Sequence, residues 1–296
     1  DDSDTLDGHT LMASAGVYLE QVVIYKSVEL VGAGAATTFI KAPATMPIAS
    51  NPDSTIVKVT GASVSAEIHD FTITGPGPSG CGSILAGIFV RDGAYANIHD
   101  NNIIDIRDTG DSGCQNGNAI MVGRYSLGTS GTADITNNLI DNYQKNGIVV
   151  TNTGSDATIT GNQVLGDGPK TTIAENGIQI GDGATAEINN NIVSGHSFTP
   201  FSWISTGIML YQAGETNTDG NTITENQVGI YIYETNGTHR DNTISATATG
   251  TGSPGFWGLI DYPASGQTTT LTGNTFTSDN SSGGVALYAD ASSGYT

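Results

Sequence analysis

Four ionisable side chains in the second half of the chain are candidates for acid–base chemistry. His196, Glu234 and Asp261 can each exchange a proton near neutral pH, and Tyr233 adds a further proton donor. Such groups catalyse a reaction when they face the bond that breaks. A single surface histidine is more often an ordinary side chain, so a role in catalysis and a plain surface position both stay open for His196.

Aromatic residues surround these candidates. Two long loops, Gly195 to Ser205 and Ala246 to Trp257, carry Trp203 and Trp257, and only a short loop separates them. The floor between them is expected to hold the tyrosines of the neighbouring strands, Tyr211, Tyr231 and Tyr233. Sugar rings stack on aromatic faces, so this arrangement predicts a groove for a polysaccharide. In the alternative, both tryptophans fold down and cover apolar side chains.

Two further groups are weaker candidates. Lys145, Lys170 and Glu175 lie in loops of the middle coils, where Lys170 could neutralise the carboxylate of a uronate. Asp105, Asp108 and Asp111, around Arg107, offer carboxylate oxygens of the kind that bind calcium, although turn capping explains them as well. Calcium is therefore the only cofactor that we consider, and none is required.

A repeat positions all of these side chains. Segments with the same pattern align with one another: AGIFVRDGAYANIHDNNIID (86–105), NGIVVTNTGSDATITGNQVLGD (146–167), NGIQIGDGATAEINNNIVSGH (176–196), TGIMLYQAGETNTDGNTITEN (206–226) and VGIYIYETNGTHRDNTISA (228–246). Apolar residues alternate with period two in short strands, and we expect Ile178, Ile180, Ile188 and Ile192 to point inward. Coils stacked about 4.8 Å apart then share one core.

This pattern predicts an all-β fold, a single right-handed parallel β-helix of about nine or ten coils with uneven corner loops. We expect one domain over residues 1–296, with a lead-in at 1–14, coils over 15–289 and a tail at 290–296. An asparagine recurs at the end of the second strand of each coil, at Asn101, Asn138, Asn162, Asn191, Asn221, Asn242 and Asn274. We interpret it as a structural ladder whose amides bond to the coils above and below.

Outward positions of the first strand fall into two columns. The first reads Phe89, Met121, Val149, Gln179, Met209, Tyr231, Leu259 and Ala286. The second reads Arg91, Gly123, Thr151, Gly181, Tyr211, Tyr233, Asp261 and Tyr288. Because a solvated face should be polar, the apolar first column predicts a cover formed by a loop, another subunit or a ligand.

Cys81 and Cys114 occupy the same corner loop in successive coils. Stacked equivalents lie at a separation that suits a disulfide, although two free buried thiols are the alternative. A disulfide indicates an oxidising compartment and hence a secreted or cell-surface protein. The sequence starts at Asp1, so a leader peptide removed earlier is compatible with it.

Composition excludes several partners. The formal charge is −20, with only 9 Lys and Arg, so nucleic acid and anionic membrane surfaces are not expected to bind. No apolar run is long enough to insert into a membrane. Self-association stays open, either through the apolar column or through the C-terminal end of the tube, whose last strand needs a cover.

The repeat, together with the opening segment AGVYLEQVVIYKSVELVGAG (15–34), resembles the pectate-lyase-like superfamily of right-handed parallel β-helices. The resemblance covers nearly the whole chain and implies the fold. It brings no catalytic residues, because the motifs of polygalacturonases, mannuronan epimerases and calcium-dependent pectate lyases are absent; only Gly195-His196-Ser197 matches part of one.

Two hypotheses for the function follow. In the first, the protein is an extracellular carbohydrate-active protein, a polysaccharide lyase or hydrolase with its site between the Trp203 and Trp257 loops. In the second, it is a non-catalytic surface, adhesive or filament-forming protein. The uneven loops favour the first hypothesis, and the missing motifs favour the second.

Overall fold

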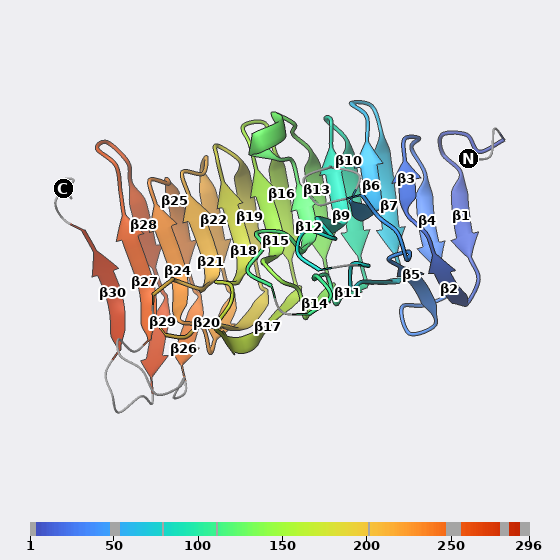
Figure 1. Cartoon of the computed structure of the whole chain (residues 1–296). Helices are drawn as coiled ribbons and strands as arrows, with labels where there is room; N and C mark the ends of the chain where they lie inside the picture. Colours follow the sequence, from blue (N-terminus) through green and yellow to red (C-terminus); the bar gives the residue numbers. More distant parts are fainter. Residues whose placement is uncertain are drawn as a thin grey trace.

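Three parallel sheets of ten strands make up the computed structural model, which describes residues 4–47, 54–78, 80–110, 112–200, 202–246, 256–278 and 284–290. We call them sheets A, B and C. The chain visits them in turn, so each coil contributes one strand to each sheet. Figure 1 shows the coils stacked into an elongated body with the two chain termini at opposite ends. The predicted β-helix of about ten coils is confirmed.

Sheet A contains β1 (Thr10–Ala13), β4 (Glu29–Gly32), β7 (Ser65–His69), β10 (Tyr95–His99), β13 (Thr132–Thr136), β16 (Asp156–Thr160), β19 (Thr185–Asn189), β22 (Thr216–Asp219), β25 (Gly237–Arg240) and β28 (Thr269–Thr272). Sheet B contains β2 (Gly16–Leu19), β5 (Thr38–Lys41), β8 (Thr72–Thr74), β11 (Asn102–Ile104), β14 (Leu139–Asp141), β17 (Gln163–Lys170), β20 (Ile192–Phe198), β23 (Thr222–Thr224), β26 (Thr243–Ala246) and β29 (Thr275–Ser278). Sheet C contains β3 (Val22–Ile24), β6 (Thr55–Thr60), β9 (Ala86–Arg91), β12 (Asn118–Val122), β15 (Asn146–Thr151), β18 (Asn176–Gly181), β21 (Thr206–Tyr211), β24 (Val228–Tyr233), β27 (Trp257–Tyr262) and β30 (Val285–Ala289).

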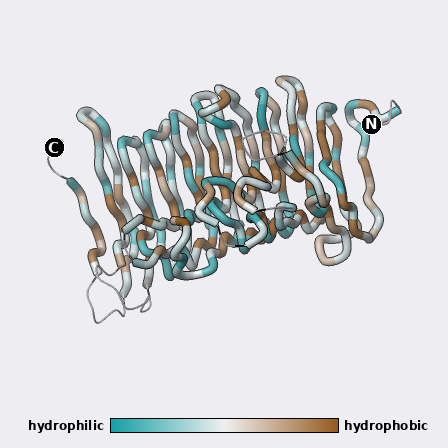
Figure 2. The backbone as a smooth tube through the Cα atoms, viewed as in Figure 1, coloured by the Kyte–Doolittle hydropathy of each residue, from teal (hydrophilic) through white to brown (hydrophobic). Residues whose placement is uncertain are grey.

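The core is a set of stacked aliphatic columns inside the tube. Ile178 pairs in register with Ile208, and both are fully buried, as are Ile180 and Ile188. Figure 2 shows the resulting alternation of apolar and polar residues along the coils. The prediction for Ile192 was wrong: its side chain is 45% exposed, and the next residue along β20, Val193, is buried instead. In a strand, a shift by one residue exchanges the two faces.

The corner between sheets A and B is a tight turn that repeats in each coil from β7 and β8 onward. The residue before each ladder asparagine has a positive φ, as at Asp100, Asn137 and Gly161. Gly, Asn and Asp tolerate this conformation best. This explains why the sequence pairs such a residue with asparagine at each corner.

The ladder itself is confirmed along its whole length. The backbone N–H of each asparagine donates to the side-chain oxygen of the next one, for example from Asn138 to Asn162 at 3.0 Å and from Asn162 to Asn191 at 2.9 Å. The amide nitrogens donate to the same oxygens and to backbone carbonyls. Every buried polar group of the turn thereby gains a partner, which is what a β-helix corner needs.

The corner loops between sheets B and C are held by a disulfide and by a buried carboxylate. Cys81 and Cys114 form the predicted disulfide, with Cα atoms 5.7 Å apart. Asp108 is fully buried beside it and accepts hydrogen bonds from the backbone N–H groups of Gly82 and Ser83. These bonds tie successive loops together.

The apolar outward column is covered by the chain itself in its first half. Phe89, Met121 and Val149 are buried in a cluster with Leu85 and Ala86, which lead into and begin β9. The predicted cover therefore exists, and these three side chains offer no apolar face for self-association. No helix within the described residues is long and apolar enough to cross a membrane.

A buried histidine gives a testable prediction about stability. His239 lies inside the tube between Thr218 and Leu271 of the adjacent coils, and its Nε2 has no hydrogen-bond partner among the described residues. Burial lowers the pKa of its imidazole to about 4. Because the unfolded chain binds this proton with a pKa near 6.5, acid favours unfolding between these two values.

The substitution His239→Leu removes the titrating imidazole, and with it the loss of stability in acid that this imidazole causes. When the pH falls from 7 to 4.5, the free energy of unfolding of wild type should decrease by about 2.5 kcal/mol more than that of the variant. Urea denaturation at the two pH values measures this difference. An identical pH dependence in both proteins would show that His239 does not stay neutral in the folded state.

Candidate functional site

Aromatic side chains form a continuous run on the outer face of sheet C. Tyr211 stacks on Tyr233 with ring centroids 4.9 Å apart and an interplanar angle of 11°. Tyr262 contacts Tyr233 at 6.4 Å and Tyr231 at 5.9 Å. Tyr288 lies 5.6 Å from Tyr262. The run therefore crosses four coils, from β21 to β30.

In-register strand pairing creates this run. Tyr211, Tyr233 and Tyr262 occupy equivalent positions in β21, β24 and β27. Each follows an inward residue, so its ring stands on the outside. We call the six aromatic residues of this surface the aromatic face: Tyr211, Tyr231, Tyr233, Trp257, Tyr262 and Tyr288.

The aromatic face is open to solvent. Tyr211 is 42% exposed and Tyr288 is 38% exposed, while Tyr231, Tyr233 and Tyr262 are half-buried. Burial raises the pKa of Tyr231 and Tyr262, and the negative charge of Glu234 raises that of Tyr233, so these three phenols stay protonated at neutral pH. The face thus offers flat apolar rings with hydrogen-bond donors at their edges.

Glu234 borders the aromatic face directly. It follows Tyr233 in a turn with φ of 49° and accepts a hydrogen bond of 2.7 Å from the Nε2 of Gln212. Gln212 follows Tyr211 in the preceding coil, and Tyr211 pairs with Tyr233. Gln212 and Glu234 therefore lie next to each other in successive coils, just beyond the tyrosines. Of the four predicted acid–base groups, Tyr233 and Glu234 are brought together here.

Asp261 does not lie in this site, which corrects our prediction. The alternation along the strand predicts an outward position for Asp261, whereas β24 and β27 pair with Ile232 opposite Asp261 and Tyr233 opposite Tyr262. Asp261 therefore points into the tube and is buried. The predicted columns are wrong by one residue in β27, where Leu259 is an inward core residue, and by two residues in β30, where Tyr288 and not Ala286 follows Ile260 in the first column.

His196 is also absent from the aromatic face. The loop predicted for it is the continuation of β20, and its imidazole is fully buried inside the tube. Its Nδ1 donates to the side-chain oxygen of Asn226 at 2.7 Å, and its Nε2 accepts a hydrogen bond from the hydroxyl of Tyr143. Burial lowers its pKa to about 4, so it stays neutral. This position favours a structural role.

The predicted lysine group assembles, but at the corner between sheets B and C. The ammonium of Lys170 lies 2.8 Å from Glu175 and 3.2 Å from Asp167, and it donates to the carbonyl oxygen of Tyr143. Burial lowers the pKa of Lys145 to about 8 and raises that of Glu175. Lys170 is thus already paired with Asp167 and Glu175 and is not placed beside the aromatic face.

The predicted calcium ligands do not form a site in the described residues. Hydrogen-bond donors surround both oxygens of Asp108: Ser83 bonds to one, and Gly82 and Ser112 bond to the other. Asp105 accepts a hydrogen bond from Asn142 in a turn with positive φ. Asp111 lies outside the described residues. The turn-capping alternative therefore fits Asp105 and Asp108.

The two tryptophans differ in position. Trp203 is 67% exposed, so it does not fold down onto the apolar column. Trp257 begins β27 and packs edge-on against Tyr288 at 5.7 Å, which makes it part of the aromatic face. Phe201 and residues 247–255 lie outside the described residues, and most of the second predicted loop wall falls among them.

Sequence reasoning missed Tyr262 as a member of the site. The segment Leu259-Ile260-Asp261-Tyr262 fits either register, because Leu and Ile are equally apolar. The signal that was available is the tyrosine itself: stacked coils repeat residue types, and Tyr211 and Tyr233 precede it in the same column.

Comparison with known proteins places this geometry in context. The structure is similar to an alginate lyase from Paenibacillus sp. str. FPU-7, with a TM-score of 0.67, 14% identity, and coverage of 97% of this chain and 93% of that one. The mannuronan C-5 epimerase A-module of Azotobacter vinelandii gives a TM-score of 0.47 at 17% identity, covering 95% and 88% of the two chains. A carrot pectin methylesterase gives 0.41 at 15% identity, covering 98% and 81%.

No curated protein matches the sequence. At these identities, the solved structures show a shared fold. A sequence model of the right-handed β-helix region matches residues 125–296, which is more than half of the chain. The chain therefore belongs to the right-handed β-helix family.

Proposed function

We propose that this protein binds a polysaccharide along the aromatic face and acts on it as a lyase or a glycoside hydrolase. The observation that carries the proposal is the run of contacting, partly exposed aromatic rings across four successive coils. Exposed aromatic area of this extent is unusual on a soluble protein unless something binds to it.

The dimensions of the face suit a chain of sugars. Neighbouring strands lie about 4.8 Å apart, so Tyr211, Tyr233 and Tyr262 form a strip that runs along the axis of the tube. Pyranose rings have an apolar face that stacks on phenol rings and hydroxyl groups that bond to their polar edges. An extended polymer can therefore lie across several coils, with one residue after another in contact with protein.

Tyr233 and Glu234 are the groups that we propose for the chemistry. A carboxylate can remove a proton from the sugar or from water, and a phenol that keeps its proton can donate it to the oxygen that leaves. The charge of Glu234 raises the pKa of Tyr233, so the phenol carries at neutral pH the proton that the donor role requires. The β-helix shared with an alginate lyase agrees with this proposal, and the disulfide supports a secreted or cell-surface location.

The test is a binding assay with a matched tyrosine control. Native electrophoresis through gels that contain alginate, pectin, polygalacturonate or a neutral glucan should show retention of the wild type by at least one polymer. Tyr233→Ala should weaken that retention by roughly 2- to 10-fold, because stacking on one aromatic ring contributes about 0.5–1.5 kcal/mol. Tyr125→Ala should not change it, since Tyr125 is a more exposed tyrosine that lies outside the aromatic face, in the 3₁₀ turn Tyr125–Leu127.

A second assay separates binding from catalysis. Glu234→Gln should keep the retention and abolish release of unsaturated or reducing sugar ends, with thermal stability unchanged. Equal product release by the variant would remove Glu234 from the mechanism. Retention by no polymer in the panel would contradict the proposal as a whole.

The rival function is assembly into a surface structure or filament. It is favoured by the exposed apolar side chains of β30, the last strand of sheet C in the described residues. Val285 and Leu287 of β30 are exposed although Leu287 continues the inward column of Leu259. An open strand edge with apolar side chains can pair with another chain. Light scattering decides between the two: a stable monomer at micromolar concentration argues against assembly.

A further inference from the structure

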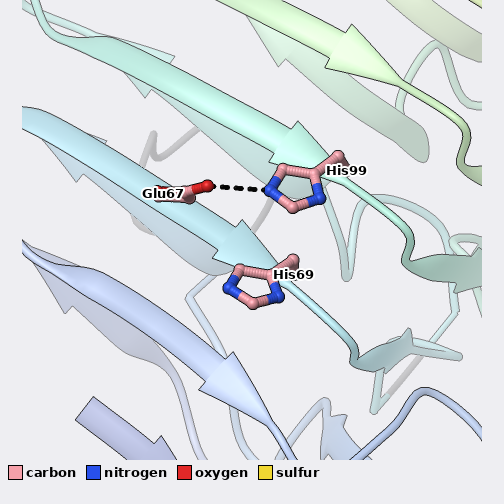
Figure 3. Close-up of side chains that lie close together, drawn as sticks. All are labelled: Glu67, His69 and His99. Atoms are coloured by element: carbon pink, nitrogen blue, oxygen red, sulfur yellow. Dashed lines mark hydrogen bonds and ion pairs between the residues drawn. The ribbon is translucent and has the colours of Figure 1, made fainter. Parts of the chain in front are cut away.

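Two histidines stand side by side on the outer face of sheet A, away from the aromatic face on sheet C. His69 ends β7 and His99 ends β10, and the two strands pair with these residues in register. Their imidazoles are stacked, with centroids 4.7 Å apart and an interplanar angle of 10° (Figure 3). Both rings are partly accessible to solvent, with 14% and 22% of the side chain exposed.

An aspartate fixes the orientation of each ring. The Nδ1 of His69 bonds to Asp70 and the Nδ1 of His99 bonds to Asp100, both at 2.8 Å. Each aspartate occupies the positive-φ position of the corner turn, so the backbone holds its carboxylate beside the ring. Hydrogen bonds of this kind, from Nδ1 to a carboxylate, orient histidines that bind metals through Nε2.

The two Nε2 atoms face glutamates. Nε2 of His99 lies 2.9 Å from Oε1 of Glu67, as Figure 3 shows, and Nε2 of His69 lies 3.2 Å from Oε1 of Glu29. Glu29 and Glu67 are neighbours on β4 and β7, two residues before the histidine column. A proton on each Nε2 makes these contacts hydrogen bonds to the glutamates, and a metal ion that displaces those protons would be bound by the same nitrogen and oxygen atoms.

We propose that His69, His99, Glu67 and Glu29 bind one divalent transition-metal ion, of which zinc is the best match. The donor atoms of Glu67, His69 and His99 lie within 4.8 Å of one another. Around a tetrahedral zinc they would approach to roughly 3.3 Å, as bonds of 2.0–2.1 Å require. The two glutamates are flexible and more than a third exposed, so they can close around the ion.

The donor set explains the choice of metal. Two imidazoles with carboxylates suit zinc, copper or nickel, whereas calcium and magnesium prefer oxygen ligands alone. Because β4, β7 and β10 belong to three successive coils, the ion would link these coils and stabilise the N-terminal third of the tube. A shallow hollow lined by Tyr95 and Asn97 adjoins the two glutamates and gives the ion access to them.

The sequence carries a signal for this site that our interpretation did not use. The tripeptide Ile-His-Asp occurs at 68–70 and again at 98–100, one coil apart. The inward isoleucine, outward histidine and corner aspartate recur together, so stacking must place the two histidines in contact.

The test is a titration of the metal-free full-length protein with zinc chloride. Isothermal titration calorimetry should give one site per chain, and the melting temperature should rise with zinc. Cobalt in place of zinc should produce the visible absorption of a four-coordinate site with nitrogen ligands. His99→Gln should weaken binding at least 100-fold, and Asp100→Asn by about 10–100-fold. The control His9→Gln changes an exposed histidine outside the cluster and should leave binding unchanged.

Three results would overturn the proposal. They are the absence of a calorimetric or thermal response at millimolar zinc, an unchanged affinity in His99→Gln with normal circular dichroism, and a response to calcium but not to zinc. Glu67→Gln provides a second check should His99→Gln fold poorly: it removes one carboxylate at a more exposed position and should still reduce the affinity.

Discussion

Replacing Ile208 by alanine should lower the free energy of unfolding by about 2–5 kcal/mol. Ile208 is fully buried in β21 and stacks in register between Ile178 and Ile230 of the adjacent coils. The substitution removes three methylene-sized groups from a column that backbone pairing holds at a fixed spacing. The neighbours can collapse into the cavity only by distorting that pairing, so the cavity cost should be large.

The matched control is Ile192→Ala in the adjacent strand β20. Its side chain is exposed, so the same chemical change should alter the unfolding free energy by no more than about 0.5 kcal/mol. Urea denaturation of both variants measures the difference. Comparable losses in the two variants would mean that the register of sheet B is shifted by one residue.

Removal of the disulfide should have the second large effect on stability. Cys81 and Cys114 are 33 residues apart, and the chain-entropy model gives up to about 3–4 kcal/mol for a loop of that length. The double variant Cys81→Ser/Cys114→Ser should therefore unfold at clearly lower urea concentration. Asp108 and its hydrogen bonds remain in the variant, so the loop should stay folded at room temperature.

The redox state can be checked without mutagenesis. Intact-mass analysis after alkylation should find no reactive thiol in the native protein and two after denaturation and reduction. Two alkylated cysteines in the native, oxidised protein would disprove the bridge and would remove its support for a secreted or cell-surface location.

The fold could be predicted because every coil repeats the same local rules. An aliphatic residue at alternate positions sets the inside of each strand, and a positive-φ residue followed by asparagine sets the corner. These are short-range features that appear in a single sequence. The stacking then follows because each coil can bury its apolar face only against the next one.

The site was harder to predict, because it depends on register and loop length. Our interpretation placed Asp261 at the outward position that Tyr262 occupies. Residues 247–255 lie between β26 and β27, and the repeat pattern does not fix the register of a strand that follows such a long insertion. The sequence predicts a corner loop from Gly195 to Ser205 that includes His196, whereas β20 runs on to Phe198 and carries the imidazole into the tube. The sequence still predicted three tyrosines of the aromatic face correctly, Tyr211, Tyr231 and Tyr233, because β21 and β24 follow one another at the regular spacing of the repeat.

The most direct test of the account is a crystal structure of the protein soaked with an oligosaccharide cut from a polymer that retains it in the gel assay. We predict density for at least two sugar rings, stacked on Tyr233 and on Tyr211 or Tyr262, with a hydroxyl group or glycosidic oxygen within hydrogen-bond distance of Glu234. Sugar density on another sheet, with the aromatic face left to solvent, would contradict the proposed function.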